Sequence, residues 1–331
     1  MSHIAITGIG LLSCLGQGIT LHSNRLDVIE PSSADCTIFP PFPILPLADV
    51  DLTVHVPKKS DQRQMERWQL MGVHAAGEAL QVAGFDTRDS RSRVDMHMVT
   101  NGGGRDLDAD LAILADVDRP GPQLNQAMMA RLRPSYFLSQ LPNLLAGNVA
   151  HVLGVLGAAR TFMGDESAGV SAIETACKRL TDGLSDVMLV GAVFDAEGPD
   201  RALDLAAAGL LGSEGFIPGS QAAALVLECE DHAAERGAQV LARMSAPNRS
   251  FRDLFGLSGR LFASAASGSD GLTGIPEDGV MTTDLTGFGL EAQFLSQLAL
   301  AATCLAEGHS AHASVAMKGR RSATVQLEAK L

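Results

Sequence analysis

Two neighbouring segments decide the fold: residues 160–180, RTFMGDESAGVSAIETACKRL, and residues 186–194, DVMLVGAVF. In the first, a short strand turns at Gly164 and Asp165 into a helix with one apolar face. That face carries Val170, Ile173, Cys177 and Leu180. The second segment is a continuous apolar run, typical of a strand that is buried on both sides of a sheet. Together they predict an α/β protein with helices on both faces of its sheet.

The surrounding sequence extends this alternation. Its apolar periodicities predict strands at residues 3–9, 95–100, 221–228 and 322–327, and helices at residues 62–83, 141–153, 231–236 and 290–305. Residues 34–57 are rich in proline and are expected to form an irregular, extended surface segment. Residues 245–283 are rich in Ser, Gly and Ala and weakly periodic, so we expect them to be looped.

Composition excludes several classes of partner and site. The 331 residues include 38 acidic and 25 basic side chains, giving a net charge of −13, which disfavours nucleic acid and anionic membranes as partners. The five cysteines form no CxxC pair and indicate neither zinc nor disulfides, and no other metal or cofactor is expected. The longest apolar stretch, residues 144–159, contains Asn148 and His151 and is too short for a helix that spans a bilayer. With no signal peptide visible, a soluble cytoplasmic protein is expected.

The turn into the helix at residues 165–167 has two interpretations. In one, Asp165 caps the helix and Glu166 occupies its acidic first turn. In the other, Ser167 is a nucleophile, because residues 164–169, GDESAG, are similar to the G-x-S-x-G elbow of α/β-hydrolases. Residues 101–104, NGGG, would then supply an oxyanion loop, and His309 or His312 the base. The match departs by one position, because an aspartate stands where the first glycine of the motif belongs.

Five blocks, in their order along the chain, resemble the β-ketoacyl-ACP synthases, a family of thiolase-like condensing enzymes. They are residues 6–16 (ITGIGLLSCLG), 64–84, 143–150 (NLLAGNVA), 186–193 and 214–228 (EGFIPGSQAAALVLE), within about the first 245 residues. This resemblance implies a thiolase-like, layered α-β-α-β-α fold. It also implies an N-terminal ketosynthase-like half at residues 1–244 and a shortened C-terminal half at residues 245–331, together one compact unit.

The same resemblance implies that the catalytic positions are degenerate. The family's acylated cysteine corresponds to Glu166, and its two histidines correspond to Ser267 and Phe288. Condensation needs a thiolate to hold the acyl chain and imidazoles to polarise the malonyl thioester. A carboxylate and a phenyl ring supply neither group. The sequence therefore predicts that this chain does not condense acyl and malonyl thioesters.

A degenerate member of this family resembles a chain length factor, the silent paralogue that pairs with an active ketosynthase in type II polyketide, fatty-acid-type or aryl polyene synthesis. The resemblance implies a heterodimer that shapes the acyl tunnel, with acyl carrier protein docking on the partner. Its interface would include Thr161, Phe162, Met163 and Gly164. The alternatives are a cysteine-less malonyl-ACP decarboxylase, a homodimeric binding protein, and a serine hydrolase that uses Ser167.

Overall fold

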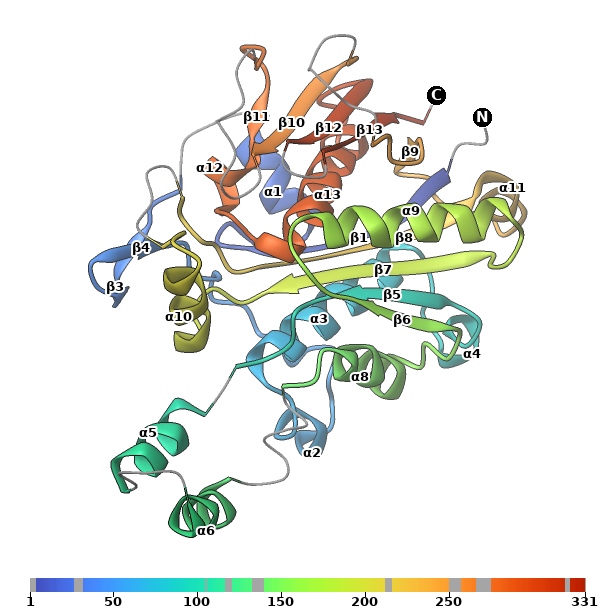
Figure 1. The fold of residues 1–331 in the computed structure, drawn as a ribbon. Coiled ribbons are helices and arrows are strands. Elements are labelled where there is room, and N and C mark those ends of the chain that lie inside the picture. Colours follow the sequence, from blue (N-terminus) through green and yellow to red (C-terminus); the bar gives the residue numbers. More distant parts are fainter. Residues whose placement is uncertain are drawn as a thin grey trace.

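The computed structural model of the protein describes residues 4–26, 32–104, 106–116, 121–132, 140–211, 216–249, 257–265, 275–318 and 322–330. In this part of the chain an extended mixed sheet runs through the molecule, with helices on both of its faces (Figure 1). The predicted α/β class is therefore confirmed. Within these residues, no helix combines the length and the apolar character that crossing a membrane requires.

The N-terminal part of the sheet consists of five strands. They are β1 (Ile4–Ser13), β5 (Asp95–Val99), β6 (Ala159–Phe162), β7 (Val187–Phe194) and β8 (Gln221–Cys229). Their spatial order is β1-β8-β7-β5-β6. Strand β5 runs parallel to both β6 and β7, whereas β8 runs antiparallel to both β7 and β1. Because β6 ends the path, one of its edges has no neighbouring strand among the described residues.

The C-terminal part repeats this arrangement. Its strands are β9 (Ala242–Met244), β10 (Arg260–Ala265), β11 (Val280–Met281), β12 (His312–Lys318) and β13 (Ala323–Glu328), in the order β11-β10-β12-β13-β9. Strand β10 is parallel to β11 and β12, and β13 is antiparallel to β12 and β9. When the five strands of each part are numbered by their order along the chain, both parts have the same spatial order: third, second, fourth, fifth, first. Strand β9 also pairs with β1 and so joins the two parts.

Two long helices fill the layer between the two groups of strands (Figure 1). Helix α9 (Ser167–Thr181) precedes β7, and helix α13 (Gln293–Ala306) occupies the equivalent place before β12. On the other face of the N-terminal strands lie α3 (Arg67–Val82) and α8 (Asn143–Leu153). Glycines permit the close approach of α3 to β1: a Cβ on Gly10 would lie 2.0 Å from the carbonyl oxygen of Ala75.

The outer face of the C-terminal strands is covered differently. Leu261, Ala263 and Ala316 form a small cluster there, over which Leu257 and Ile275 pack. On the equivalent face of the N-terminal strands, α3 and α8 bury a much larger apolar cluster. Among the described residues, the apolar cluster on this outer face of the C-terminal strands is therefore much the smaller of the two.

Shorter elements complete the described structure. They are β2 (Gly16–Gln17), α1 (Gly18–Leu26), β3 (Asp35–Phe39), β4 (Phe42–Ile44), α2 (Lys59–Gln62), α4 (Arg88–Arg91), α5 (Leu107–Asp116), α6 (Pro122–Arg131), α10 (Pro199–Ala207), α11 (Glu230–Glu235), α12 (Thr282–Thr286) and the 3₁₀ helix η1 (Leu290–Ala292). Figure 1 shows α5 and α6 projecting away from the layered body.

Three sequence expectations need correction. Residues 245–283 are not simply looped, because β10 and β11 lie within them and α12 begins there. Residues 34–57 are not wholly irregular, since β3 and β4 pair as an antiparallel hairpin. The expected helix at residues 62–83 begins later, because α2 ends at Gln62 and α3 begins at Arg67. The side chains of Glu66 and Gln69 form a capping box at the start of α3.

Candidate functional site

The elbow between β6 and α9 is held by a reciprocal pair of hydrogen bonds. The side-chain amide of Asn101 donates to the carbonyl oxygen of Gly164 over 2.9 Å, and the Gly164 N–H donates to Asn101 Oδ1 over 2.8 Å. Gly164 has a φ of +135°, a conformation that side chains strongly disfavour. The loop after β5 and the turn after β6 are thereby fixed to one another at the start of α9.

Asp165 caps the helix, as the first interpretation of the sequence predicts. Its Oδ1 accepts the backbone N–H of Ser167 over 2.9 Å and the hydroxyl of Ser167 over 2.5 Å. Glu166 and Ser167 are both buried at the first turn of α9. Glu166 thus places a carboxylate at the positive end of this helix, where the helix dipole favours an anion.

The hydrogen bonds of Ser167 do not build a hydrolase site. Its hydroxyl donates to an aspartate rather than to a histidine. Of the two histidines suggested as a base, His309 lies 2.6 Å from the hydroxyl of Ser23 on α1, and His312 is exposed at the start of β12. A serine activated for attack needs an oriented base within hydrogen-bond reach.

Phe288 is buried and packs against the segment that precedes β8. Its backbone N–H donates to the carbonyl oxygen of Ile217 over 2.8 Å, and its carbonyl oxygen accepts the N–H of Gly219 over 3.0 Å. Its buried ring lies 4.8 Å from the ring of Phe216, at an interplanar angle of 47°. The side chain at this position therefore contributes packing and neither donates nor accepts a proton.

The fold brings the segment after Phe288 against the helix after Glu166. A Cβ on Gly169 of α9 would lie 3.1 Å from Leu295 Cδ1 and 3.5 Å from the carbonyl oxygen of Glu291. Two of the three degenerate positions named from the sequence are therefore followed by segments in contact with each other: Glu166 directly precedes α9, and Phe288 precedes the segment that packs on α9. Ser267 lies outside the described residues.

A buried carboxylate joins the two halves beside this elbow. Glu291 in η1 is fully buried; its Oε1 accepts the backbone N–H of Asn101 over 2.9 Å and lies 3.8 Å from the Arg201 guanidinium. Arg201 also donates to the carbonyl oxygen of Gly102 over 2.6 Å. Burial raises the pKa of Glu291, an effect that the positive charge of Arg201 only partly offsets. Glu291 could not be picked out from the sequence, because its two contacts, Asn101 and Arg201, come from distant parts of the chain.

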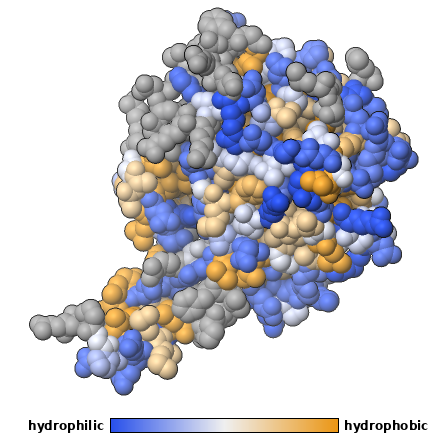
Figure 2. Space-filling view, turned by 45° about the vertical axis from the view of Figure 1, so that its right-hand side comes forward, coloured by the Kyte–Doolittle hydropathy of each residue, from blue (hydrophilic) through white to orange (hydrophobic). Residues whose placement is uncertain are grey.

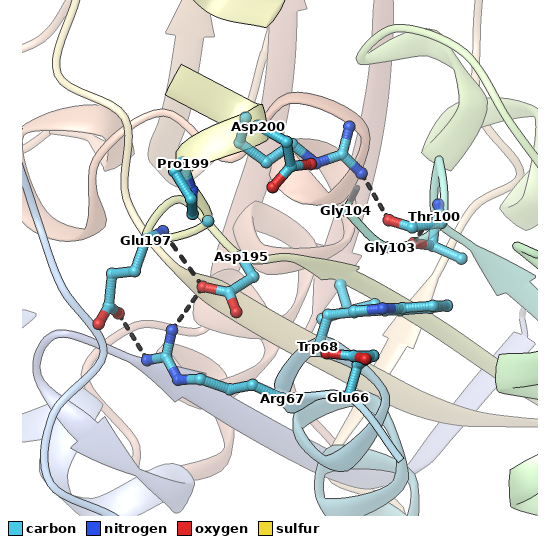
Figure 3. A pocket seen from close by; sticks show the side chains of 14 residues that line it. Glu66, Arg67, Trp68, Thr100, Gly103, Gly104, Asp195, Glu197, Pro199 and Asp200 are labelled. Carbon is cyan, nitrogen blue, oxygen red and sulfur yellow. Dashed lines mark hydrogen bonds and ion pairs between the residues drawn. The ribbon is translucent and has the colours of Figure 1, made fainter. Parts of the chain in front are cut away.

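A polar cavity of about 450 Å³ opens beside the loop that contains Gly102 (Figure 3). Arg67, at the start of α3, lies between two carboxylates and contacts Asp195 and Glu197 at 2.5 Å each. Burial raises the pKa of Asp195, although Arg67 and Ser220 act in the opposite direction. These residues match no motif in the sequence. The one available signal was the acidic pair two residues apart directly after the buried strand β7.

The residues expected at an interface lie on the free edge of the described sheet. Phe162 is half-buried, with its ring 5.0 Å from the ring of His97, whereas Met163 is 61% exposed. Thr161 is also half-buried and Gly164 is exposed. A second cavity, of about 360 Å³, lies at this edge and is lined by Phe162, Met163, Gly164, Asp165, Ser167, Ala168 and Ser171.

The sequence of the chain is similar to a family profile and to several known proteins. The family profile described as "Beta-ketoacyl synthase, N-terminal domain" matches residues 47–233. The chain is 25% identical over 294 residues to a 3-oxoacyl-[acyl-carrier-protein] synthase 2 of Vibrio harveyi, covering 82% of this chain and 66% of that protein. It is 26% identical over 270 residues to a putative polyketide beta-ketoacyl synthase 1 of Streptomyces halstedii, covering 73% and 62%. The chain thus spans slightly less than two thirds of the length of these relatives.

Solved structures agree with the sequence comparison at the level of the fold. The ishigamide ketosynthase/chain length factor aligns over 100% of both chains with a TM-score of 0.75 and 16% identity. A β-ketoacyl synthase from Burkholderia phymatum aligns equally completely, with a TM-score of 0.73 and 16% identity. The thiolase-like fold expected from the resemblance is therefore confirmed, and the chain belongs to the β-ketoacyl synthase family.

Proposed function

We propose that this chain is a non-condensing ketosynthase-like subunit, a chain length factor, that pairs with an active β-ketoacyl synthase. The observation that carries the proposal is the chemistry at the elbow of α9. Glu166 stands where the resemblance places a cysteine, and the buried ring of Phe288 stands where it places a histidine. Neither group can form a thioester or polarise a malonyl carbonyl by hydrogen bonding.

No neighbouring thiol compensates for Glu166 on the same helix. The cysteine carried by α9 is Cys177, ten residues after Ser167, and burial raises the pKa of its thiol to about 12. A thiol with such a pKa is almost fully protonated at neutral pH and is a poor nucleophile. The proposed role of this chain in the pair is therefore structural: it shapes the space in which the partner extends its acyl chain.

The proposal also explains where a partner would bind. Among the described residues no strand pairs with the outer edge of β6, so backbone N–H and C=O groups there are available for pairing, and such edges readily add another strand. Phe162 and Met163 supply apolar contacts beside that edge. Acyl carrier protein would then dock on the partner. The name of the ishigamide ketosynthase/chain length factor describes a pair of this kind.

Condensation is the direct test of the proposal. The purified chain is incubated with acyl-loaded and malonyl-loaded carrier protein, and products are measured by mass spectrometry. The 3-oxoacyl synthase 2 of Vibrio harveyi serves as the active control. We expect a β-ketoacyl product from the control and none from this chain. Product formed by this chain alone would contradict the proposal, and malonyl decarboxylation without condensation would favour the decarboxylase alternative.

Assembly is the second test. We expect the chain to be poorly soluble when expressed alone and to co-purify in equal amounts with an intact ketosynthase encoded beside it. Met163→Asp should weaken this pairing, because it places an unpaired charge in the proposed interface. Leu184→Asp is the matched control, since Leu184 is 63% exposed in the turn between α9 and β7. A monodisperse monomer from solo expression would argue against the obligate pair.

A further inference from the structure

The polar cavity beside the loop of Gly102, here called the side cavity, has room for a small organic molecule. Its volume of about 450 Å³ lies within the range of about 300–1,000 Å³ that is typical of ligand sites. Figure 3 shows that its lining comes from the start of α3, the loop after β5 and the segment after β7. A different part of the surface is apolar: Figure 2 shows hydrophobic residues gathered on the projecting helices α5 and α6.

The lining of the side cavity is rich in charge. Its charged residues are Glu66, Arg67, Asp195, Glu197, Asp200 and Arg201. A hydrocarbon chain is a poor occupant of such a cavity, because it would desolvate these groups without replacing their hydrogen bonds to water. The lining therefore indicates a polar ligand.

The two arginines of this lining already have partners. Arg67 lies between Asp195 and Glu197, at 2.5 Å from each. Arg201 donates to the carbonyl oxygen of Gly102 over 2.6 Å. An anionic ligand would have to displace these groups before it could contact either guanidinium. The cavity therefore does not favour an anion.

Asp200 is a lining carboxylate that lacks a partner. It is half-buried in the first turn of α10, and among the described residues its carboxylate forms no hydrogen bond and no ion pair. The glycine loop lies directly against it, since a Cβ at Gly104 would be 2.4 Å from Asp200 Oδ1. A partly desolvated carboxylate at a cavity is best satisfied by a donor that carries a positive charge.

Trp68 supplies a second unpartnered group, which is independent of the carboxylates. Its side chain lines the cavity and is only 6% exposed, and its indole N–H has no acceptor among the described residues. Figure 3 shows its ring below Thr100 and Gly103, with Asp200 above them. A buried N–H without an acceptor is costly, so a ligand that brings an oxygen atom to it is favoured.

We infer that the side cavity binds a small amine that also carries a hydroxyl or carbonyl oxygen. The ammonium group of the ligand donates to the Asp200 carboxylate, and its oxygen accepts the indole N–H of Trp68. A ligand that lacks either group leaves one side of the cavity unpaired, which gives the site its specificity. A metal ion fits less well, because no group of three or more metal-ligating side chains occurs in the described part of the chain.

The test uses three probes that share a chain of four carbons: 4-amino-1-butanol, n-butylamine and 1,4-butanediol. Their binding to the full chain is measured by titration calorimetry. We expect 4-amino-1-butanol to bind about tenfold or more tightly than n-butylamine, and 1,4-butanediol not to bind. The affinity should fall as salt is raised. Because Trp68 is the one tryptophan of the sequence, its fluorescence should change as 4-amino-1-butanol saturates the site.

Two substitutions assign the two contacts. Asp200→Asn removes the charge at nearly constant shape and should weaken binding of 4-amino-1-butanol by about tenfold or more. Asp231→Asn is the matched control: Asp231 also stands in the first turn of a helix, α11, but is exposed and outside the cavity, so binding should not change. Trp68→Phe keeps an aromatic ring without the N–H, and should reduce the affinity for 4-amino-1-butanol to that for n-butylamine.

Unchanged affinity for 4-amino-1-butanol in Asp200→Asn would overturn the inference, as would the absence of binding by all three probes. If Trp68→Phe still preferred the amino alcohol over the amine, the assigned contact with the indole N–H would be wrong. These measurements use no acyl substrate and no partner subunit. Their outcome is therefore independent of whether the chain is inactive in condensation.

Discussion

Glu291 offers the sharpest test of how the two halves are held together at the elbow of α9. It is fully buried, its Oε1 accepts the N–H of Asn101 over 2.9 Å, and Arg201 lies 3.8 Å away. Two substitutions separate its hydrogen bond from its charge. Glu291→Gln keeps the oxygen acceptor and almost the same volume, and Glu291→Ala removes both.

The expected magnitudes differ between the two substitutions. In Glu291→Ala, the partly buried N–H of Asn101 loses its acceptor, which costs about 1–3 kcal/mol, and the loss of two buried side-chain carbons leaves a cavity worth about 1–2 kcal/mol. We therefore expect the free energy of unfolding to fall by about 2–5 kcal/mol in that variant. Glu291→Gln should stay within about 1 kcal/mol of the original chain, because the removed charge is one that burial disfavours.

The pH dependence follows from the same burial. The pKa of Glu291 is raised by desolvation above its ordinary value of 4.5, so the folded state holds the proton where the unfolded state has released it. Stability therefore decreases as pH rises from about 4.5 through the raised pKa, by about 1.4 kcal/mol for each unit of difference. This contribution should be absent from Glu291→Gln, whose stability should change less over that interval.

Urea unfolding followed by tryptophan fluorescence measures both quantities. The sequence contains one tryptophan, Trp68, which is buried at the start of α3 and reports on the packed state. Equal losses of stability in the two variants would refute the reasoning, because the charge rather than the acceptor would then stabilise the site. An unchanged Glu291→Ala would refute it as well.

Three further outcomes follow. Desolvation of buried Glu228 is outweighed by hydrogen bonds from Arg236, Thr7 and His232, which lower the pKa of its carboxyl. The stabilisation by this carboxylate is therefore present above pH 4.5 and declines on acidification. Glu228→Gln should lack this pH dependence, and calorimetry should show that it is about 3 kcal/mol less stable at neutral pH. Gly10→Ala should lower the unfolding temperature by displacing α3, at a cost of about 1–3 kcal/mol, whereas Gly147→Ala, whose new Cβ would meet nothing closer than 4.0 Å, should not. A fluorophosphonate probe should leave Ser167 unlabelled, since its hydroxyl is bonded to a carboxylate; labelling that Ser167→Ala abolishes would restore the hydrolase alternative.

The sequence alone determined the local elements around the elbow. The apolar face of residues 170–180 and the uninterrupted run at residues 187–194 are signals that neighbours along the chain generate, and both appear as α9 and β7. The cap supplied by Asp165 was likewise readable, because capping joins residues two apart. The family resemblance followed from the same continuous blocks.

Strands that contain many small residues could not be predicted from the periodicity of the sequence. Strand β12, HASVAMK, is buried through most of its length on both faces, and β10, RLFASA, also mixes alanine and serine with larger residues. Alternation between apolar and polar side chains is weak in such segments, so periodicity gives no clear period. The repeat of strand order in the two halves depends on these strands and could not be seen beforehand.

Tertiary structure alone decided the charged clusters and the free surfaces. Asn101 and Glu291 are 190 residues apart, and Arg67 and Asp195 are 128 apart, so each pair meets only because the fold brings distant segments of the chain together. Strand β6 ends the order of strands in the part of the chain that the structure describes, a position that residues 159–162 do not encode by themselves. The sequence fixes local geometry through near neighbours, whereas contacts over these separations form only when the whole chain folds around one core.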